Sequence, residues 1–282
     1  MSRSYDARRK AKRQQARTAR EDTGDAHRWH LSRAITAIPV LVIAAILATV
    51  GILGFGGTSS AVDRTEIQQR VKRLLTGIPQ QGAMLGSPKA PITLWVYADL
   101  ECPTVKRFVT AHLPSIIRTW VRDGTVNLEY LSLRTDTYDE RTFFNQEAAA
   151  MAAGRQNKMW NYALTFIHEQ GERHANYATD EFLTDIASQV PGLSRTRWQH
   201  DRQDSSLSKR VARELHFAST QELQSTPSFS LTYSGATGSV REEVEASLSA
   251  AVDALNEESS GDAPTLGSFG AKQSNLEKIE QP

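Results

Sequence analysis

The longest apolar run of the chain covers residues 34–57, and no charged residue stands between positions 34 and 62. A helix needs about 20 apolar residues to cross the hydrocarbon layer of a membrane. The apolar core of a cleaved signal peptide is shorter, about 7–15 residues, and follows a short basic segment. Here 33 residues precede the run. We therefore expect residues 34–57 to form one uncleaved transmembrane helix in contact with membrane lipid.

Basic side chains gather on one side of this run. Residues 1–33 contain ten Lys or Arg and four Asp or Glu, whereas the whole chain has 33 basic and 32 acidic side chains, so the remainder is net acidic. Positively charged flanks stay in the cytoplasm. This predicts a single-pass protein of the cell membrane, with a disordered cytoplasmic segment 1–33 and an extracytoplasmic C-terminal domain. Because topology accounts for the basic charge, we expect no nucleic-acid partner.

Cys102 is the only cysteine in the chain. A single cysteine excludes an intramolecular disulfide framework and also excludes metal sites built on paired cysteines. The seven histidines show no spacing typical of metal ligands. We therefore expect neither a metal ion nor any other cofactor.

Strand and helix patterns alternate after the apolar run. Residues 92–98 and 126–133 are short and rich in β-branched and aromatic side chains, which predicts two strands. Between them, apolar residues recur at helical intervals from 108 to 121, and Pro114 is expected to kink or break that helix. Strand, helix and strand of these lengths predict a βαβ unit with parallel strands.

The second half of the chain is mostly helical in pattern. Residues 140–220 contain Ala-rich and amphipathic segments without a convincing strand. Residues 227–233 return to strand character, and residues 241–258 predict a closing helix. The last segment, 258–282, is rich in Ser, Gly, Pro and charge, which predicts disorder.

Cys102 follows the first predicted strand through a short loop and directly precedes a helix. Unpaired N–H groups at a helix start stabilise an anion, which lowers the pKa of a thiol there. Pro103 suits the first helical position, because its missing N–H is not needed there. Glu101 opposes the effect and Thr104 adds no charge, so we expect a lowered but not extreme pKa at a site that is not deeply buried. The alternative is that Cys102 is a small buried hydrophobe.

The order of motifs resembles that of membrane-anchored bacterial DsbA-like thioredoxin-fold proteins, a thiol-disulfide oxidoreductase family. Members typically carry Cys-Pro-x-Cys at the first motif, which Cys102 and Pro103 match, and Thr-Pro with a cis proline before the third strand, which Thr226 and Pro227 match. The resemblance covers residues 71–255. It implies that Thr226 and Pro227 receive an extended substrate chain beside the thiol.

The same resemblance implies the fold and the domain organisation. The fold is expected to be α/β and thioredoxin-like, with a helical insertion of the DsbA type at about 140–220. Residues 58–90 are expected to form a helix and linker after the membrane helix, and residues 91–257 the thioredoxin-fold domain.

Val105 stands where the family has its second, resolving cysteine. Disulfide exchange proceeds when a thiolate attacks a disulfide and forms a mixed disulfide. In the family the second cysteine releases that intermediate by an intramolecular attack, which has a high effective concentration. With Val105 the chain can neither hold a disulfide of its own nor donate one, so release depends on an external thiol.

Two functions are compatible with this motif. The first is monothiol disulfide exchange of a reductase or isomerase type, acting on exported proteins or their disulfides. Cys102 would attack a substrate disulfide, or accept a low-molecular-weight thiol, and would be released by an external thiol. The second is a non-catalytic, chaperone-like module that binds polypeptide near Pro227 and keeps Cys102 as a vestige of a redox site. The first would make the protein an enzyme, and the second would not.

Overall fold

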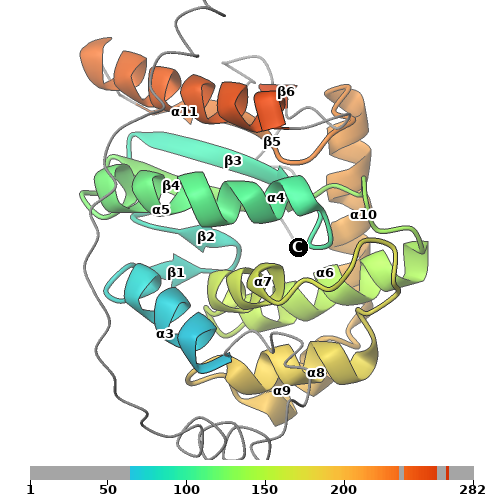
Figure 1. The fold of residues 1–282 in the computed structure, drawn as a ribbon. Coiled ribbons are helices and arrows are strands. Elements are labelled where there is room, and N and C mark those ends of the chain that lie inside the picture. The colour runs from blue at the N-terminus through green and yellow to red at the C-terminus, as the bar shows by residue number, and fades with distance from the viewer. Residues whose placement is uncertain (1–63, 235–237, 259–264, 267–282) are drawn as a thin grey trace, which may run out of the picture. The chain divides into compact units, whose positions relative to one another are not determined.

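The computed structural model describes residues 64–234, 238–258 and 265–266 (Figure 1). The predicted cytoplasmic segment 1–33 and the predicted transmembrane helix 34–57 lie outside these residues. Within the described part of the chain, no helix is both long and apolar enough to cross a membrane. All described residues belong to one compact unit.

A six-stranded sheet forms the centre of the unit, in the order β1-β2-β4-β3-β5-β6. Its three long strands are β3 (Ile92–Ala98), β4 (Val126–Ser132) and β5 (Ser228–Tyr233). β3 pairs parallel with β4 and antiparallel with β5. The parallel pair confirms the predicted βαβ unit.

Short strands lie at both edges of the sheet. The hairpin of β1 (Gln80–Gln81) and β2 (Met84–Leu85) pairs with β4, and β6 (Thr265–Leu266) pairs with β5. The hairpin falls in the expected linker, and β6 falls in the tail that was expected to be disordered. Two-residue strands are too short to show an alternation of polar and apolar residues, so no local pattern predicts them.

Helices surround the sheet. α3 precedes it, five helices are inserted between β4 and β5, and α11 follows β5 (Figure 1). Their bounds are α3 (Arg64–Leu75), α6 (Glu140–Gly154), α7 (Met159–His168), α8 (Asp180–Gln189), α9 (Arg195–Asp201), α10 (Ser205–Thr220) and α11 (Gly238–Glu258). The five inserted helices confirm the predicted helical insertion at about 140–220.

Side-chain caps fix where several inserted helices begin. Thr179 accepts a hydrogen bond from the N–H of Phe182 at the start of α8, and Asp204 accepts one from the N–H of Ser206 at the start of α10. Such caps satisfy N–H groups that have no partner within the helix. They explain why these polar helices start where they do.

The helix that begins after Cys102 is not uniform. Its α-helical parts, α4 (Pro103–Arg107) and α5 (Leu113–Ile116), alternate with π-helical turns η1 (Phe108–His112) and η2 (Ile117–Val121). Pro114 lies at the start of α5, directly after a π-helical turn. A proline cannot donate the usual backbone hydrogen bond. A change of helix type thus accommodates Pro114, where the sequence predicted a kink or a break.

β3 is buried on both faces, which accounts for its continuous apolar sequence. Leu94 and Val96 face the main core, together with side chains from α4, α7 and α11. Trp95 and Tyr97 face the opposite side and pack with Ala218 of α10. Because helices cover both faces, the end of β3 is held rigidly at the point where the chain turns toward Cys102.

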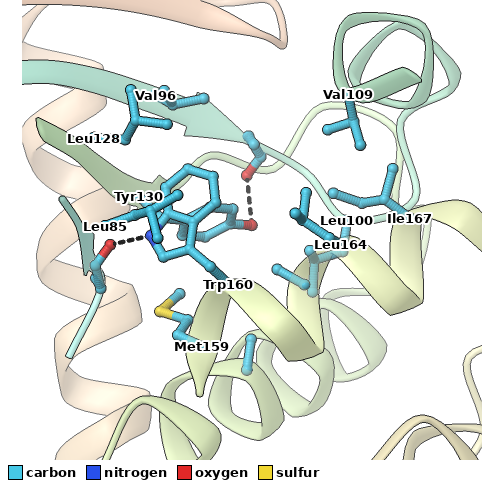
Figure 2. Packing of buried hydrophobic residues seen from close by; sticks show 14 of the residues in the cluster. Leu85, Val96, Leu100, Val109, Leu128, Tyr130, Met159, Trp160, Leu164 and Ile167 are labelled. Carbon is cyan, nitrogen blue, oxygen red and sulfur yellow. Dashed lines mark hydrogen bonds between the residues drawn. The ribbon is translucent and has the colours of Figure 1, made fainter. Parts of the chain in front are cut away.

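The main core ties the inserted helices to the sheet (Figure 2). Trp160 of α7 donates its ring N–H to the carbonyl of Ala83 in the hairpin at 2.7 Å. Its ring meets that of Tyr130 edge to face, with 6.4 Å between the centroids. Tyr130 in turn donates its hydroxyl to the carbonyl of Ala98 at 3.3 Å. These contacts place α7 beside the carboxyl end of β3.

Candidate functional site around Cys102

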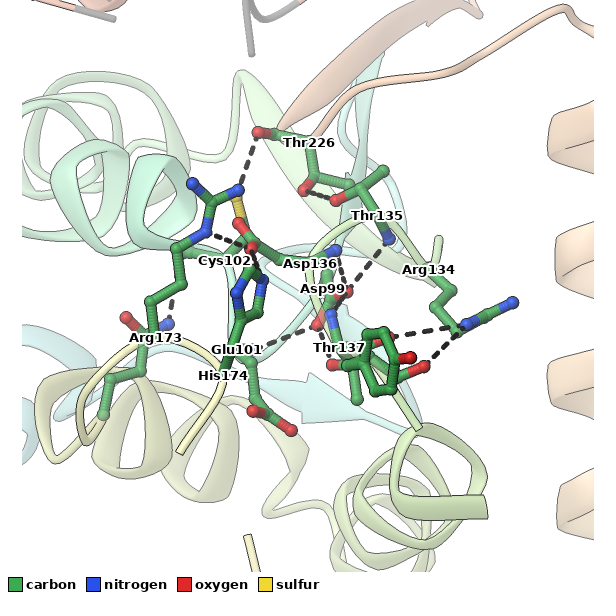
Figure 3. Close-up of polar contacts among 12 residues, drawn as sticks. Asp99, Glu101, Cys102, Arg134, Thr135, Asp136, Thr137, Arg173, His174 and Thr226 are labelled. Atoms are coloured by element: carbon green, nitrogen blue, oxygen red, sulfur yellow. Dashed lines mark hydrogen bonds and ion pairs between the residues drawn. The ribbon is translucent and has the colours of Figure 1, made fainter. Parts of the chain in front are cut away.

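Cys102 lies between the end of β3 and the start of α4 (Figure 3). It is the N-cap residue of α4, and Pro103 takes an early helical position, as the sequence predicted. The thiol Sγ donates a hydrogen bond to the carbonyl oxygen of Thr226 at 3.3 Å. The peptide bond between Thr226 and Pro227 is cis. The fold therefore brings the two predicted motifs together, although they are far apart in the sequence.

The surroundings of Cys102 differ from the expected ones. Only 1% of the residue is exposed, and it packs in the main hydrophobic core. Burial raises the pKa of the Cys102 thiol to about 11, while hydrogen bonds from Thr226 and from the backbone at Val105 and Thr104 lower it. The expected lowered pKa and incomplete burial are therefore wrong. The stabilisation of an anion at the helix start is present, but desolvation of the thiolate exceeds it.

The other motif residues are buried as well. Thr104 is 4% exposed and Val105 is 1% exposed. Val105 belongs to the same hydrophobic core as Cys102. The Thr104 hydroxyl accepts a hydrogen bond from the guanidinium of Arg107 at 2.9 Å. The first turn of α4 thus offers Cys102 an apolar neighbour at the position of the missing cysteine, and the described residues contain no second thiol.

The buried carboxylate of Asp99 organises the loop between β4 and α6 (Figure 3). It accepts hydrogen bonds from the backbone N–H groups of residues 135–137 at 2.8–3.0 Å and from the N–H of Glu101 at 3.0 Å. The Thr137 hydroxyl and the Gln146 amide also donate to it. This role of Asp99 was not predicted from the sequence. The only available signal was an acidic residue directly after a buried strand.

Thr135 connects the loop held by Asp99 to the segment with the cis proline. Its hydroxyl lies 2.5 Å from the hydroxyl of Thr226. Thr226 therefore faces Cys102 through its carbonyl and Thr135 through its side chain. Both contacts hold the backbone next to Pro227 in one position relative to the thiol.

The connection between α7 and α8 is attached to the same site. Gln170 donates its amide to the carbonyls of Leu100 at 2.6 Å and of Cys102 at 3.1 Å. Arg173 Nε donates to the carboxylate of Asp136 at 2.5 Å. Gln170 and Arg173 carry no sequence signal for this placement, because they meet the site only through tertiary packing.

Glu101 is a second titratable group beside the thiol. It is 8% exposed, and its Oε1 has no hydrogen-bond partner among the described residues. Burial raises the pKa of Glu101 to about 7, and the negative charge of Asp99 adds to the shift. Glu101 therefore takes up a proton near neutral pH, next to a thiol that stays protonated.

The described residues hold no group of three or more His, Cys, Asp or Glu side chains that could bind a metal ion. The acidic side chains near Cys102 instead accept hydrogen bonds from the protein or pair with Arg173.

Comparison with known proteins places this geometry in a family. The family model described as "Thioredoxin" matches residues 79–253. No curated protein sequence matches the chain. Among solved structures, oxidised BdbD from Bacillus subtilis is 16% identical, with a TM-score of 0.50, and the match covers 61% of this chain and 97% of that one. DsbA from Chlamydia trachomatis is 16% identical, with a TM-score of 0.48, covering 60% and 90% of the two chains.

The family model covers more than half of the chain, from the β1–β2 hairpin to α11. The likeness to BdbD extends over nearly the whole of that protein and shows a common fold. The inserted helices α6–α10 lie between β4 and β5, where the sequence resemblance predicted them. The chain therefore belongs to the thioredoxin family, and its fold is the DsbA-like thioredoxin fold with a helical insertion.

Proposed function

We propose that this protein is a membrane-anchored, extracytoplasmic member of the family that carries out monothiol disulfide exchange through Cys102. The observation that supports this most is the 3.3 Å contact between the Cys102 thiol and the Thr226 carbonyl, beside the cis peptide bond to Pro227. A thiol and a backbone segment suited to receive an extended chain thus meet at one point. The membrane anchoring rests on the apolar run at residues 34–57 and on its basic flank.

In the proposed reaction, the Cys102 thiolate attacks one sulfur of a disulfide in an exported protein. The disulfide breaks, the second sulfur leaves as a thiolate, and Cys102 is joined to the first in a mixed disulfide. The thiolate of a low-molecular-weight thiol then attacks the substrate sulfur of the mixed disulfide. A new disulfide forms between these two sulfurs, and Cys102 leaves as a thiolate. The external thiol is required because Val105 replaces the resolving cysteine.

In this structure the Cys102 thiol is protonated and buried. With a pKa of about 11, only about one thiol in ten thousand is ionised at pH 7. Because the thiol is also 1% exposed, a substrate disulfide reaches Cys102 only after local opening around it. We propose that a bound polypeptide at Thr226 and Pro227 takes over the carbonyl to which the thiol now donates.

The burial of the Cys102 thiol favours a second candidate function. A protonated thiol in an apolar core is also what a non-catalytic polypeptide-binding protein would keep as a residue of its fold. In that case the segment at Thr226 and Pro227 binds extended chains in a chaperone-like manner, and Cys102 contributes only packing. Val105 is equally compatible with this function.

Trapping of mixed disulfides separates the two functions. The full chain and its Cys102→Ser variant would be exposed to exported proteins that carry disulfides, and adducts would be detected by non-reducing electrophoresis and mass spectrometry. Monothiol exchange predicts adducts at Cys102 that a low-molecular-weight thiol releases. Absence of adducts, together with polypeptide binding that Cys102→Ser leaves unchanged, would establish the second function.

A Val105→Cys variant provides a positive control for the intramolecular step that needs a second cysteine. Position 105 lies one helical turn after Cys102, where the family carries its resolving cysteine. After mild oxidation, we expect this variant to lose both free thiols to an intramolecular disulfide, as counted by thiol titration. Two free thiols after oxidation would contradict the placement of Val105 at the resolving position.

A further inference from the structure

Four arginines surround one hollow on the surface, away from Cys102. The hollow has a volume of about 300 Å³. Residues of α3 and of the helical stretch ending at Val121 line it, namely Arg70, Arg73, Leu74, Pro114, Arg118 and Arg122. No acidic side chain is among these lining residues. The hollow is therefore a concentrated positive site at the junction of two helical elements.

Two of the four arginines already have structural partners. Arg122 donates to the carbonyls of Thr76, Arg73 and Leu74 at 2.7–3.2 Å, and so satisfies acceptors at the end of α3. Arg70 pairs with Glu66 at 2.9 Å. Glu66 balances the charge of Arg70, whereas Arg122 keeps its charge but uses its donors to hold the end of α3.

Arg73 and Arg118 have charge that no described residue balances. Arg73 reaches only the neutral amide of Gln69, at 3.4 Å. Arg118 makes no hydrogen bond or ion pair with any residue in the described part of the chain, and it is exposed. Each guanidinium has five N–H donors in a planar fork, so both side chains retain donors that an anion could accept.

The charge of this hollow is opposite in sign to the net charge of the chain outside residues 1–33. Outside residues 1–33 the chain is net acidic, yet every charged residue that lines this hollow is basic. Like charges that are held close together repel one another unless a counter-ion is bound. A phosphate-bearing group matches the fork of a guanidinium and carries the required charge.

Chain connectivity indicates where that phosphate comes from. Six residues separate the predicted membrane helix from Arg64, and six residues span at most about 20 Å. Arg70 and Arg73 follow within the first three turns of α3. We propose that the hollow binds the phosphate of anionic phospholipid headgroups in the membrane that carries the protein. The choice of lipid rests on the proposed anchoring and does not involve Cys102.

The test uses a fragment of residues 59–282 and lipid vesicles. This fragment keeps the whole hydrophobic core of the described residues, which extends from Ile67 to Leu255 in the sequence, so it folds without the preceding segment. Binding would be measured by co-sedimentation with phosphatidylcholine vesicles with and without phosphatidylglycerol, at about 0.15 M salt. Inorganic phosphate would be titrated separately by calorimetry.

The decisive variant is R73Q/R118Q, which leaves the structural contacts of Arg70 and Arg122 in place. We expect binding to the phosphatidylglycerol vesicles to fall about 30-fold, since each arginine near an anionic surface contributes about fivefold. The control is R195Q/R213Q, which makes the same change in net charge at exposed positions on α9 and α10 outside the hollow. It should bind within about twofold of the parent, because screening at this salt confines the effect to nearby charges.

Three outcomes would overturn the proposal. One is absence of binding to phosphatidylglycerol vesicles. Another is an equal loss in the control variant, which would mean that net charge alone determines binding. The third is a calorimetric signal for inorganic phosphate that depends on Arg73 and Arg118 without vesicle binding, which would make a soluble anion the ligand. A Cys102→Ser fragment that binds vesicles like the parent would show that the result is independent of the thiol chemistry.

Discussion

Asp99 and Cys102 stand three residues apart on the same turn after β3, and both are buried, yet the fold surrounds them differently. The carboxylate of Asp99 accepts six hydrogen bonds, four of them from backbone N–H groups. The thiol of Cys102 donates a single hydrogen bond, to the carbonyl of Thr226. Glu101, between them, leaves one carboxylate oxygen without a partner. The turn is thus organised around the carboxylate, while the thiol occupies an apolar space beside it.

Asp99 is thus the group that stabilises the site, and Cys102 is the group that could react there. A buried charge is stable only where hydrogen bonds replace the water it loses. Asp99 meets that condition, whereas a thiolate at Cys102 would not. The loop beside Cys102 therefore keeps its shape whatever the state of the thiol, and reactivity depends on how often the thiol is uncovered.

The largest expected effect is on stability and comes from Asp99. Asp99→Ala leaves several buried donors without an acceptor, so we expect a loss of about 4 kcal/mol in the free energy of unfolding, measured by urea denaturation. Thr179→Ala, which removes only the cap of α8, should cost about 1 kcal/mol. If Asp99→Ala costs no more than Thr179→Ala, Asp99 does not organise the turn.

Substitution of Glu101 is expected to have a smaller effect on the free energy of unfolding, with a defined pH dependence. Because its pKa is raised to about 7, Glu101 contributes stability when protonated, and this contribution is lost as the pH rises from about 4.5 to 7. Glu101→Gln mimics the protonated form. The variant should be close to the parent at pH 4.5 and more stable by about 3 kcal/mol at pH 8. A stability difference that does not change with pH would contradict the raised pKa.

The smallest effect at neutral pH is expected from Cys102. Cys102→Ser keeps a donor for the Thr226 carbonyl, so the free energy of unfolding should change by less than about 1 kcal/mol at pH 7. The parent should become less stable as the pH rises from about 8.5 to 11, because the unfolded thiol ionises first. At pH 10 this loss, absent from the variant, amounts to about 2 kcal/mol. Parallel pH profiles would show that the thiol pKa is not raised.

The elements of the fold were largely readable from the sequence because each left a local pattern. The strand at residues 92–98 was predicted with the bounds that the structure has, since β-branched and aromatic residues run there between Pro91 and Asp99. The parallel pairing and the inserted helices followed from the order of elements. The π-helical turns around Pro114 left no pattern, because their apolar spacing is close to that of an α-helix.

Only part of the site around Cys102 could be predicted from the sequence. Cys102 contacts Thr226 of the second motif, and the peptide bond from Thr226 to Pro227 is cis. The pKa of the thiol was predicted with the wrong sign, because burial depends on what packs over it. Gln170 and Arg173, which attach the α7–α8 connection to this site, lie about 70 residues away from Cys102 in the chain. No rule based on local sequence identifies such neighbours.

The order of the strands has a consequence for how another polypeptide could approach. The outermost strands of the sheet, β1 and β6, have two residues each. On the β4 side, the N–H of Ser132 donates to the carboxylate of Glu214 at 2.8 Å, so a side chain takes the place of a neighbouring strand. Short and covered edges discourage a second chain from joining the sheet. The described edges of the sheet therefore offer little backbone with which a second chain could pair and start aggregation.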